Sequence, residues 1–458
     1  MGYVEGHGLE GSDAALLTRG LPHLADAEPQ ATTRGRIVIG GRRLEDLFED
    51  VLLGRLNYET NLFKILCGEA LDADMEVLAA PMLIGLATGQ ADGRDLQSVR
   101  LAASTHAPFE LAILPFLRHC EKFAQTATRL AAGEACAQPP TPSGARLALR
   151  LAGMLGKVRP QSKYLKLLET CEVLSADLVV AAFLLEAGLA PQIMPFVKIV
   201  ARLPAAGAVY LDEIAQRPNR FIGVDAPGAG CGAQADLAET GLALLDEGAT
   251  FAAVMVRLAL GRATSASEAV PINAALIAGA EYGVSPASSV MMRLICDDGV
   301  GPADAVQAMI STFGCYHLGA LKQSAAVIAC VAHGATLDDA IARHALTDSD
   351  GRIRVAGFGH RFQKRDPRAV LLLRMCQQLY PGKYIEAACL LDDALGERRI
   401  GYINMDGIGA AMGLQGGMAP DIVSLLTLVA RTPGIAKALR QATPMNGDCE
   451  LRVRNGLK

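Results

Sequence analysis

The chain has 458 residues, of which 51% are hydrophobic and only 5% aromatic, and its formal net charge is −5. This length exceeds the roughly 100–200 residues usual for one domain, so we expect more than one structural unit. The charge excludes the basic surface that nucleic-acid binding needs, and no apolar run approaches the ~20 residues of a membrane span. We therefore expect a cytoplasmic protein with neither nucleic-acid nor membrane partners.

Residues 1–34 begin with an acidic, polar stretch that lacks the pattern of a secretory signal, and we expect a weakly ordered leader. The eleven cysteines are scattered singly without a CxxC pair, which predicts reduced thiols and no metal site. The glycine-rich string GAGCG at 228–232 has no strand before it and no GK[ST] after it. It is therefore predicted to be part of a linker and not a phosphate loop.

Two pairs of similar segments predict an internal duplication. Residues 57–89 resemble residues 250–283, and in this match Tyr58 aligns with Phe251, 193 positions later.

The second match is closer. Residues 181–204 resemble residues 410–433, with a glycine, an Ala-Pro pair and an Ala-Arg pair in register, so that Arg202 aligns with Arg431 229 positions later. Chance similarity between alanine-rich helices does not readily place these three features together.

These matches predict a first copy over 35–223, a linker over 224–235 and a second copy over 236–458. Both copies contain apolar residues at helical spacing, for example LEDLFEDVLLGRL and AVLLLRMCQQLY. An all-α fold follows from this spacing.

The most specific string is GFGHRFQKRDPR at 357–368, which occurs only in the second copy. It resembles the citrate synthase family, including its citryl-CoA lyase branch, in which a G-x-G-H turn and a D-P-R are signatures. NMDGIGAAMG (404–413) resembles the family's N-x-D segment, VARTPG (429–434) its R-x-x-G helix start, and GCYHLGA (314–320) the stretch with its first catalytic histidine. The resemblance implies a multihelical citrate-synthase-like fold with a degenerate first copy and a complete second copy.

The chemistry of this family starts from a CoA thioester, whose methyl group is a very weak carbon acid. A carboxylate must take the proton while a donor stabilises the enolate oxygen. The resemblance implies that Asp406 is this base, that His317 donates to the thioester oxygen and that His360 donates to the keto oxygen. In the cleavage direction His360 would accept the hydroxyl proton. No cofactor is implied beyond the CoA thioester, which is a substrate.

The resemblance also implies binding residues. Arg368 and Arg431 would hold substrate carboxylates, because a guanidinium binds a carboxylate through two parallel hydrogen bonds. Arg361, Lys364 and Arg365 lie where the family binds the CoA phosphates.

Each assignment has a plainer alternative. His360 could be a turn histidine with a backbone partner, Asp406 a helix N-cap, and His317 a structural histidine. Arg431 recurs as Arg202, which suggests a structural role as much as binding. The basic cluster at 361–365 could be a solvated face.

Two departures from the family pattern concern the substrate and the partner subunit. Glu281-Tyr282-Gly283 stands where the family usually has Asp-His-Gly, so Tyr282 offers a hydroxyl donor and the substrate identity is open. The second copy lacks the family's C-terminal Arg-Pro pair, whereas the first copy contains QRPNRFIG at 216–223. We hypothesise that Arg217 reaches the second copy's site within an intrachain pseudo-dimer. The alternative is an ordinary linker turn.

The sequence therefore predicts condensation of acetyl-CoA, or a short acyl-CoA, with oxaloacetate or a related 2-keto acid. Cleavage by a citryl-CoA lyase is the alternative within enzymes. A non-catalytic acyl-CoA-binding or regulatory paralogue is the alternative of another class. Further assembly into a homo-oligomer stays open.

Overall fold

A computed structural model describes residues 38–39, 42–89, 93–134, 141–215, 237–280, 288, 291, 295, 300–313, 320–348, 350–360 and 365–442. The predicted leader and linker lie outside the described residues. The described part is almost entirely helical, which confirms the all-α prediction. Its strands form two small antiparallel hairpins, β1 (Val38–Ile39) with β2 (Arg42–Arg43) and β3 (Ala345–Thr347) with β4 (Ile353–Val355).

The first half of the chain forms short helices around one long apolar helix. Its elements are α2 (Leu44–Leu52), α3 (Tyr58–Cys67), α4 (Ala73–Glu76), α5 (Ala79–Thr88), α6 (Arg94–Ser104), α7 (Phe109–Ala112), α8 (Leu114–Ala131), α9 (Pro142–Val158), α10 (Lys163–Leu168), α11 (Ala176–Glu186) and α12 (Met194–Ala215). The predicted helical segment LEDLFEDVLLGRL forms α2, where apolar residues at helical spacing are buried and Glu45 and Asp46 complement the positive end of the helix dipole.

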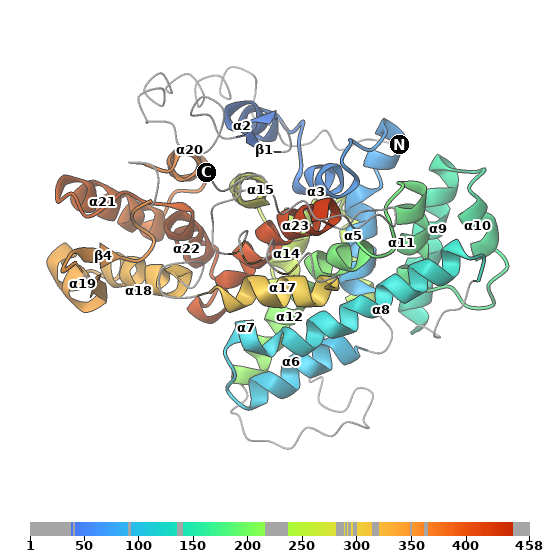
Figure 1. The fold of residues 1–458 in the computed structure, drawn as a ribbon. Helices are drawn as coiled ribbons and strands as arrows, with labels where there is room; N and C mark the ends of the chain where they lie inside the picture. The colour runs from blue at the N-terminus through green and yellow to red at the C-terminus, as the bar shows by residue number, and fades with distance from the viewer. Residues whose placement is uncertain are drawn as a thin grey trace, which may run out of the picture.

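The second half continues with another set of helices. These are α13 (Leu237–Asp246), α14 (Phe251–Leu260), α15 (Ala266–Ala280), α17 (Pro302–Ser311), α18 (Ala320–Ala332), α19 (Leu337–His344), α20 (Pro367–Leu379), α21 (Lys383–Glu397), α22 (Met405–Gln415), the 3-10 helix η2 (Pro420–Ile422) and α23 (Ser424–Ala442). In Figure 1, α18, α19, α21 and α22 form one end of the molecule and α9 and α10 form the opposite end.

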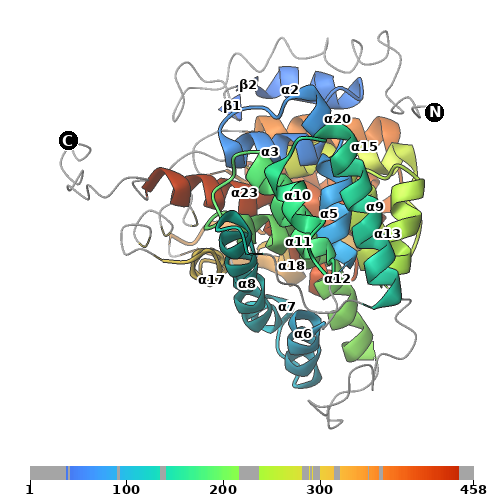
Figure 2. The same ribbon diagram turned by 90° about the vertical axis from the view of Figure 1, so that its right-hand side faces the viewer.

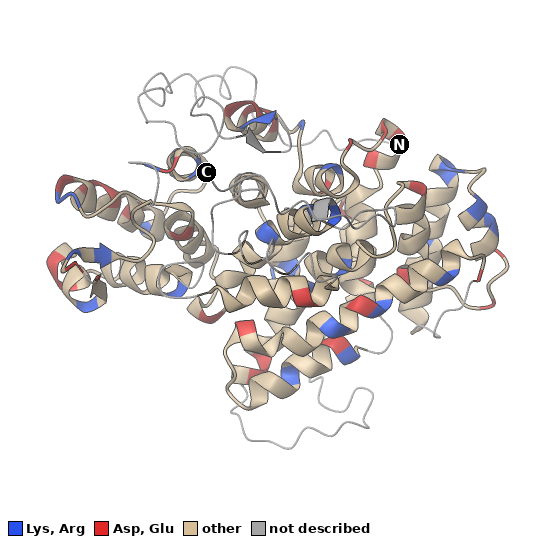
Figure 3. Cartoon of the chain, in the orientation of Figure 1, with Lys and Arg blue, Asp and Glu red and all other residues tan. Residues whose placement is uncertain are grey.

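Helix α12 lies at the centre of the molecule, where it packs against α5, α6, α8, α14 and α23. Figure 2, turned by 90°, shows α6 and α8 on one side of this core and α9 and α13 on another. Two apolar helices, Met194–Ala215 and Pro420–Arg440, have the length of a membrane span, but 89% and 78% of their apolar windows are buried inside the protein. Burial to this extent is typical of helices in the core of a folded protein. Charged side chains of both signs lie on outer helices such as α6, α8 and α21 (Figure 3).

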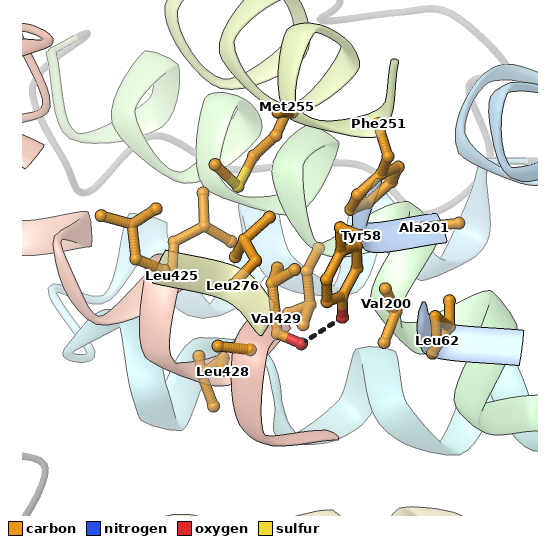
Figure 4. Packing of buried hydrophobic residues seen from close by; sticks show 14 of the residues in the cluster. Tyr58, Leu62, Val200, Ala201, Phe251, Met255, Leu276, Leu425, Leu428 and Val429 are labelled. Atoms are coloured by element: carbon orange, nitrogen blue, oxygen red, sulfur yellow. Dashed lines mark hydrogen bonds between the residues drawn. The ribbon is translucent and has the colours of Figure 1, made fainter. Parts of the chain in front are cut away.

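The two halves of the chain meet in one apolar core. The ring of Tyr58 stacks on that of Phe251, with centroids 5.5 Å apart, and the Tyr58 hydroxyl donates to the carbonyl oxygen of Val429 at 2.7 Å (Figure 4). Both rings are fully buried. Helices α3, α14 and α23, which contain these three residues, are therefore held against one another by ring packing and by a buried hydroxyl that has its hydrogen-bond partner.

Six cysteines lie within the described residues, and all six are free thiols: Cys67, Cys120, Cys171, Cys330, Cys376 and Cys389. In the same part of the chain no group of three or more His, Cys, Asp or Glu side chains has the arrangement of a metal site.

Candidate active site

The two most specific motifs of the sequence meet through their backbones. Phe358 and Ile403 form an isolated antiparallel bridge, and the Gly359 amide donates to the carbonyl oxygen of Tyr402 at 2.6 Å. The turn 357–360 is thereby held against the segment that leads into α22. His360 and Asp406, 46 positions apart in the sequence, consequently belong to one local structure.

Asn404 joins these two segments with its side chain. Its oxygen accepts hydrogen bonds from the amides of Asp406 and Gly407, at 3.0 and 3.2 Å, and so caps α22. Its amide group donates to the carbonyl oxygen of Gly359 at 2.8 Å. An N-cap normally needs only the acceptor, so this asparagine uses both ends of its amide.

Two glycines allow the segments to approach. Gly357 has a φ of +82°, in the left-handed region that favours glycine, and a Cβ on Gly407 would lie 2.4 Å from the carbonyl oxygen of Gly357. The neighbouring atom is backbone and cannot move aside as a side chain can. Both positions therefore require glycine for close packing of the turn against α22.

Asp406 lies in the first turn of α22 with part of its side chain still accessible. Desolvation by the surrounding protein raises the pKa of its carboxyl to about 6, although the charge of Arg368 opposes this shift. The charge of Asp366 acts in the same direction as desolvation. Asp406 is thus a stronger base than an ordinary aspartate and is still mostly ionised at neutral pH.

Asp366 lies between the histidine and one of the predicted substrate arginines. Its carboxylate accepts two hydrogen bonds from Arg368, from Nε at 3.0 Å and from Nη2 at 2.7 Å, and lies 3.9 Å from Nε2 of His360. Burial opposes ionisation, but Arg368 holds the pKa of Asp366 below its usual range. Burial lowers the pKa of His360, and Asp366 partly offsets this effect.

The two predicted carboxylate-binding arginines converge on the C-terminal end of α15. Nη1 of Arg368 lies 3.5 Å from the carbonyl oxygen of Ala278, and Nη1 of Arg431 lies 3.4 Å from that of Gly279. Nη2 of Arg431 also lies 3.4 Å from the Ser288 hydroxyl. Both arginines are nearly buried, at 4% and 7% exposure. The negative end of the helix dipole favours this cationic pair.

Arg365, a predicted CoA-binding residue, lies on the ring of Tyr402 with its guanidinium carbon 3.8 Å from the centroid. Its Nη1 is 3.7 Å from Asp392, and its side chain is 43% exposed. Asp392 also accepts a hydrogen bond from the Ile403 amide at 2.6 Å. Arg365 therefore combines an anchored guanidinium with solvent access, and its part in CoA binding stays a prediction.

The structure thus brings together His360, Asp406, Arg368 and Arg431, whereas five other predicted site residues lie outside the described residues: His317, Tyr282, Arg217, Arg361 and Lys364. Sequence reasoning assigned no role to Asp366 or Asn404. Both were visible as the first residues of the D-P-R and N-x-D strings, but the pairing of Asp366 with Arg368 depends on rotamers that a motif does not specify.

Comparisons with known proteins place this geometry in a family. The model of the citrate synthase C-terminal domain matches residues 199–447, which is more than half of the chain. No curated protein matches the sequence.

Solved structures of citrate synthases share the fold over nearly the whole chain. The enzyme from Thermoplasma acidophilum aligns with a TM-score of 0.54 and 16% identity, covering 96% of this chain and 98% of its own. Those from Pyrobaculum aerophilum (TM-score 0.56, 15% identity, 95% and 91% covered) and Thermotoga maritima (TM-score 0.52, 13% identity, 96% and 96% covered) align similarly.

The length interpreted as two copies therefore corresponds to a single chain of these enzymes, and the tandem duplication stays a prediction. The match to the family model, together with the His360 turn bridged to the Asp406 helix, shows that this chain belongs to the citrate synthase family.

Proposed function

We propose that the protein condenses acetyl-CoA, or a short acyl-CoA, with oxaloacetate or a related 2-keto acid. The observation that carries this proposal is the carboxyl of Asp406, with its pKa raised to about 6, in a helix start that is bridged to the His360 turn. A carboxylate of this strength suits removal of a proton from a weak carbon acid near neutral pH.

In the proposed reaction Asp406 takes a proton from the α-carbon of the thioester, and the resulting enolate carbon attacks the keto carbonyl carbon. The keto oxygen becomes an alkoxide and receives a proton from His360. Because burial lowers the pKa of His360, its imidazole is neutral at physiological pH and donates its N–H to the developing charge. His317 is the proposed donor to the thioester oxygen.

Arg431 is the stronger of the two candidates for binding a substrate carboxylate. Arg368 already directs two of its N–H groups to Asp366, whereas the contacts of Arg431 with Gly279 and Ser288 are both 3.4 Å long. We propose that Arg431 binds the carboxylate and that Arg368 contributes charge and position. The Thermoplasma acidophilum citrate synthase was solved with carboxymethyl coenzyme A and oxaloacetate, which are ligands of the classes proposed here.

The remaining assignments belong to the same proposal. Arg361, Lys364 and Arg365 would bind the CoA phosphates, and Tyr282 would offer a hydroxyl to the keto acid. Arg217 would reach the site from the first half of the chain.

The same groups serve the reverse reaction, so citryl-CoA cleavage is the second candidate. Condensation alone gives a citryl-CoA thioester, and in a synthase water then cleaves its C–S bond and releases the CoA thiol. Purified protein assayed in both directions distinguishes the two: free thiol from acetyl-CoA with oxaloacetate and water, and acetyl-CoA from citryl-CoA. Thiol release that depends on oxaloacetate supports the synthase, and cleavage without net synthesis supports the lyase. CoA binding with neither reaction would overturn both and favour a non-catalytic acyl-CoA-binding protein.

A further inference from the structure

Helices α12 and α23 are built alike. Each contains an interior proline, Pro204 and Pro433, and an arginine two positions before it. These prolines are 229 positions apart, as are Arg202 and Arg431. The similarity of the two segments therefore extends to the placement of helix-perturbing residues.

The two arginines also contact corresponding partners. Arg202 donates to both carboxylate oxygens of Asp95, at 2.8 and 3.0 Å, and Arg431 donates to the hydroxyl of Ser288. Asp95 and Ser288 are 193 positions apart, which is the offset of the other matched segment pair. A carboxylate in the first half is thus replaced by a hydroxyl in the second.

A second correspondence concerns the proposed base. Asp177 and Asp406 are each two positions after a side-chain N-cap, Ser175 of α11 and Asn404 of α22. The two aspartates are also 229 positions apart.

The surroundings of the two aspartates differ at one position. Nζ of Lys198 lies 2.5 Å from Asp177, and this lysine is only 3% exposed. The residue 229 positions after Lys198 is Thr427, in α23. Among the described residues no Lys or Arg forms a salt bridge with Asp406, and the residue of the second half that corresponds in sequence to Lys198 is neutral.

The ammonium of Lys198 donates a hydrogen bond to Asp177, so this carboxylate is engaged in a nearly buried ion pair. A carboxylate oxygen that already binds an ammonium is occupied and is not open to a carbon acid.

We propose that Thr427 is the residue that keeps Asp406 available as a base, and that the first half contains a closed counterpart of the site in which Lys198 holds Asp177. The catalytic part of this inference rests on the proposed function. The structural part, which places residue 427 beside Asp406, is independent of the proposed function.

The test replaces Thr427 by Lys, with Thr427→Met as the control of similar length and no charge. We expect kcat of Thr427→Lys to fall about 100-fold or more, which is the loss that removal of a general base causes, and that of Thr427→Met to fall by less than about tenfold. Lys198→Met should leave the specific activity of the folded protein within about twofold of the wild type, because Asp177 takes no part in the reaction.

A stability measurement tests the placement without any assay of activity. In the wild type the raised pKa of Asp406 makes the free energy of unfolding fall as pH rises from about 4 to about 6. In Thr427→Lys this decrease in unfolding free energy should disappear, because the ammonium stabilises the ionised carboxylate. In Thr427→Met the decrease should remain. The same pH dependence in both variants would overturn the inference.

If Thr427→Lys does not fold, Thr427→His provides a second variant with a smaller cation. Its activity should be low at acid pH and should recover as the imidazole loses its proton. Equal profiles for Thr427→His and its neutral match Thr427→Gln would again overturn the inference. A wild type without either carbon–carbon reaction would overturn the proposed function and leave the stability test standing.

Discussion

The side-chain amide of Asn404 donates a hydrogen bond to the carbonyl oxygen of Gly359, 2.8 Å away, and thereby ties the histidine turn to the helix that carries Asp406. The same side chain caps that helix through its oxygen. One residue therefore sets both the start of α22 and the distance between the two groups that the reaction needs. This arrangement makes the two functions of Asn404 separable by substitution.

Asn404→Ala removes the cap and the tie together. We expect it to lower the free energy of unfolding by about 1–2 kcal/mol, the usual cost of losing an N-cap, and to lower activity. Asn404→Asp keeps the capping oxygen but has no N–H for Gly359. Because a carboxylate oxygen then faces the Gly359 carbonyl oxygen, it should lose some stability as well, although it keeps the cap, and it should lose activity, as measured by urea unfolding beside the thiol assay. Wild-type activity in the aspartate variant would contradict the role of the tie.

Gly407→Ala tests the close approach of the turn to α22. Its Cβ would lie 2.4 Å from a backbone oxygen, so the segments must separate, and we expect a loss of about 1–3 kcal/mol in unfolding free energy. Gly409→Ala, two residues later in the same helix, meets only a leucine methyl at 3.7 Å and should be neutral or stabilising by up to about 1 kcal/mol. Denaturant unfolding of the pair measures the difference, and equal stabilities would contradict the packing described.

Glu59 gives the fold a dependence on pH. It is 3% exposed, and burial raises the pKa of its carboxyl to about 7 from 4.5. The folded protein therefore binds this proton more tightly than the unfolded chain does, so its contribution to stability is present below pH 4.5 and is lost as pH rises toward 7. The loss is at most about 3 to 4 kcal/mol, from about 1.4 kcal/mol for each pH unit over about 2.5 units.

The matched variant is Glu59→Gln, which keeps an acceptor for the Phe251 amide and cannot ionise. Denaturation midpoints at pH 5 and pH 8 should show a smaller decrease for this variant than for the wild type. An identical decrease in both would show that folding does not raise the pKa of Glu59.

The pH dependence of the reaction should follow Asp406. Because the base must be ionised and burial raises its pKa to about 6, kcat should rise with pH along an acid limb centred near 6. An ordinary exposed aspartate would place this limb near 4. Rates measured from pH 4.5 to 8 in one buffer series locate the limb, and a flat profile down to pH 5 would contradict the environment assigned to Asp406.

The sequence predicted the helical fold, because apolar spacing is a local property that survives without tertiary detail. The association of His360 with Asp406 was implied only by the family resemblance, and the structure bridges their two segments. It did not predict that Asp366 would bind Arg368 through two hydrogen bonds, since that choice of partner is made by rotamers in a buried space. Nor could it predict that the buried carboxyl of Glu59, in α3, accepts a hydrogen bond from the amide of Phe251 at the start of α14, 192 positions later, because only packing creates that contact.

Asp406→Asn compared with the wild type tests the central assignment most directly. The substitution removes the base and also a carboxyl whose ionisation burial disfavours, so the variant should be at least as stable as the wild type at pH 7. We predict that thiol release from acetyl-CoA with oxaloacetate falls by at least about 100-fold while the folded structure is retained. Undiminished release from the folded Asp406→Asn protein would contradict the assignment of Asp406 as the base.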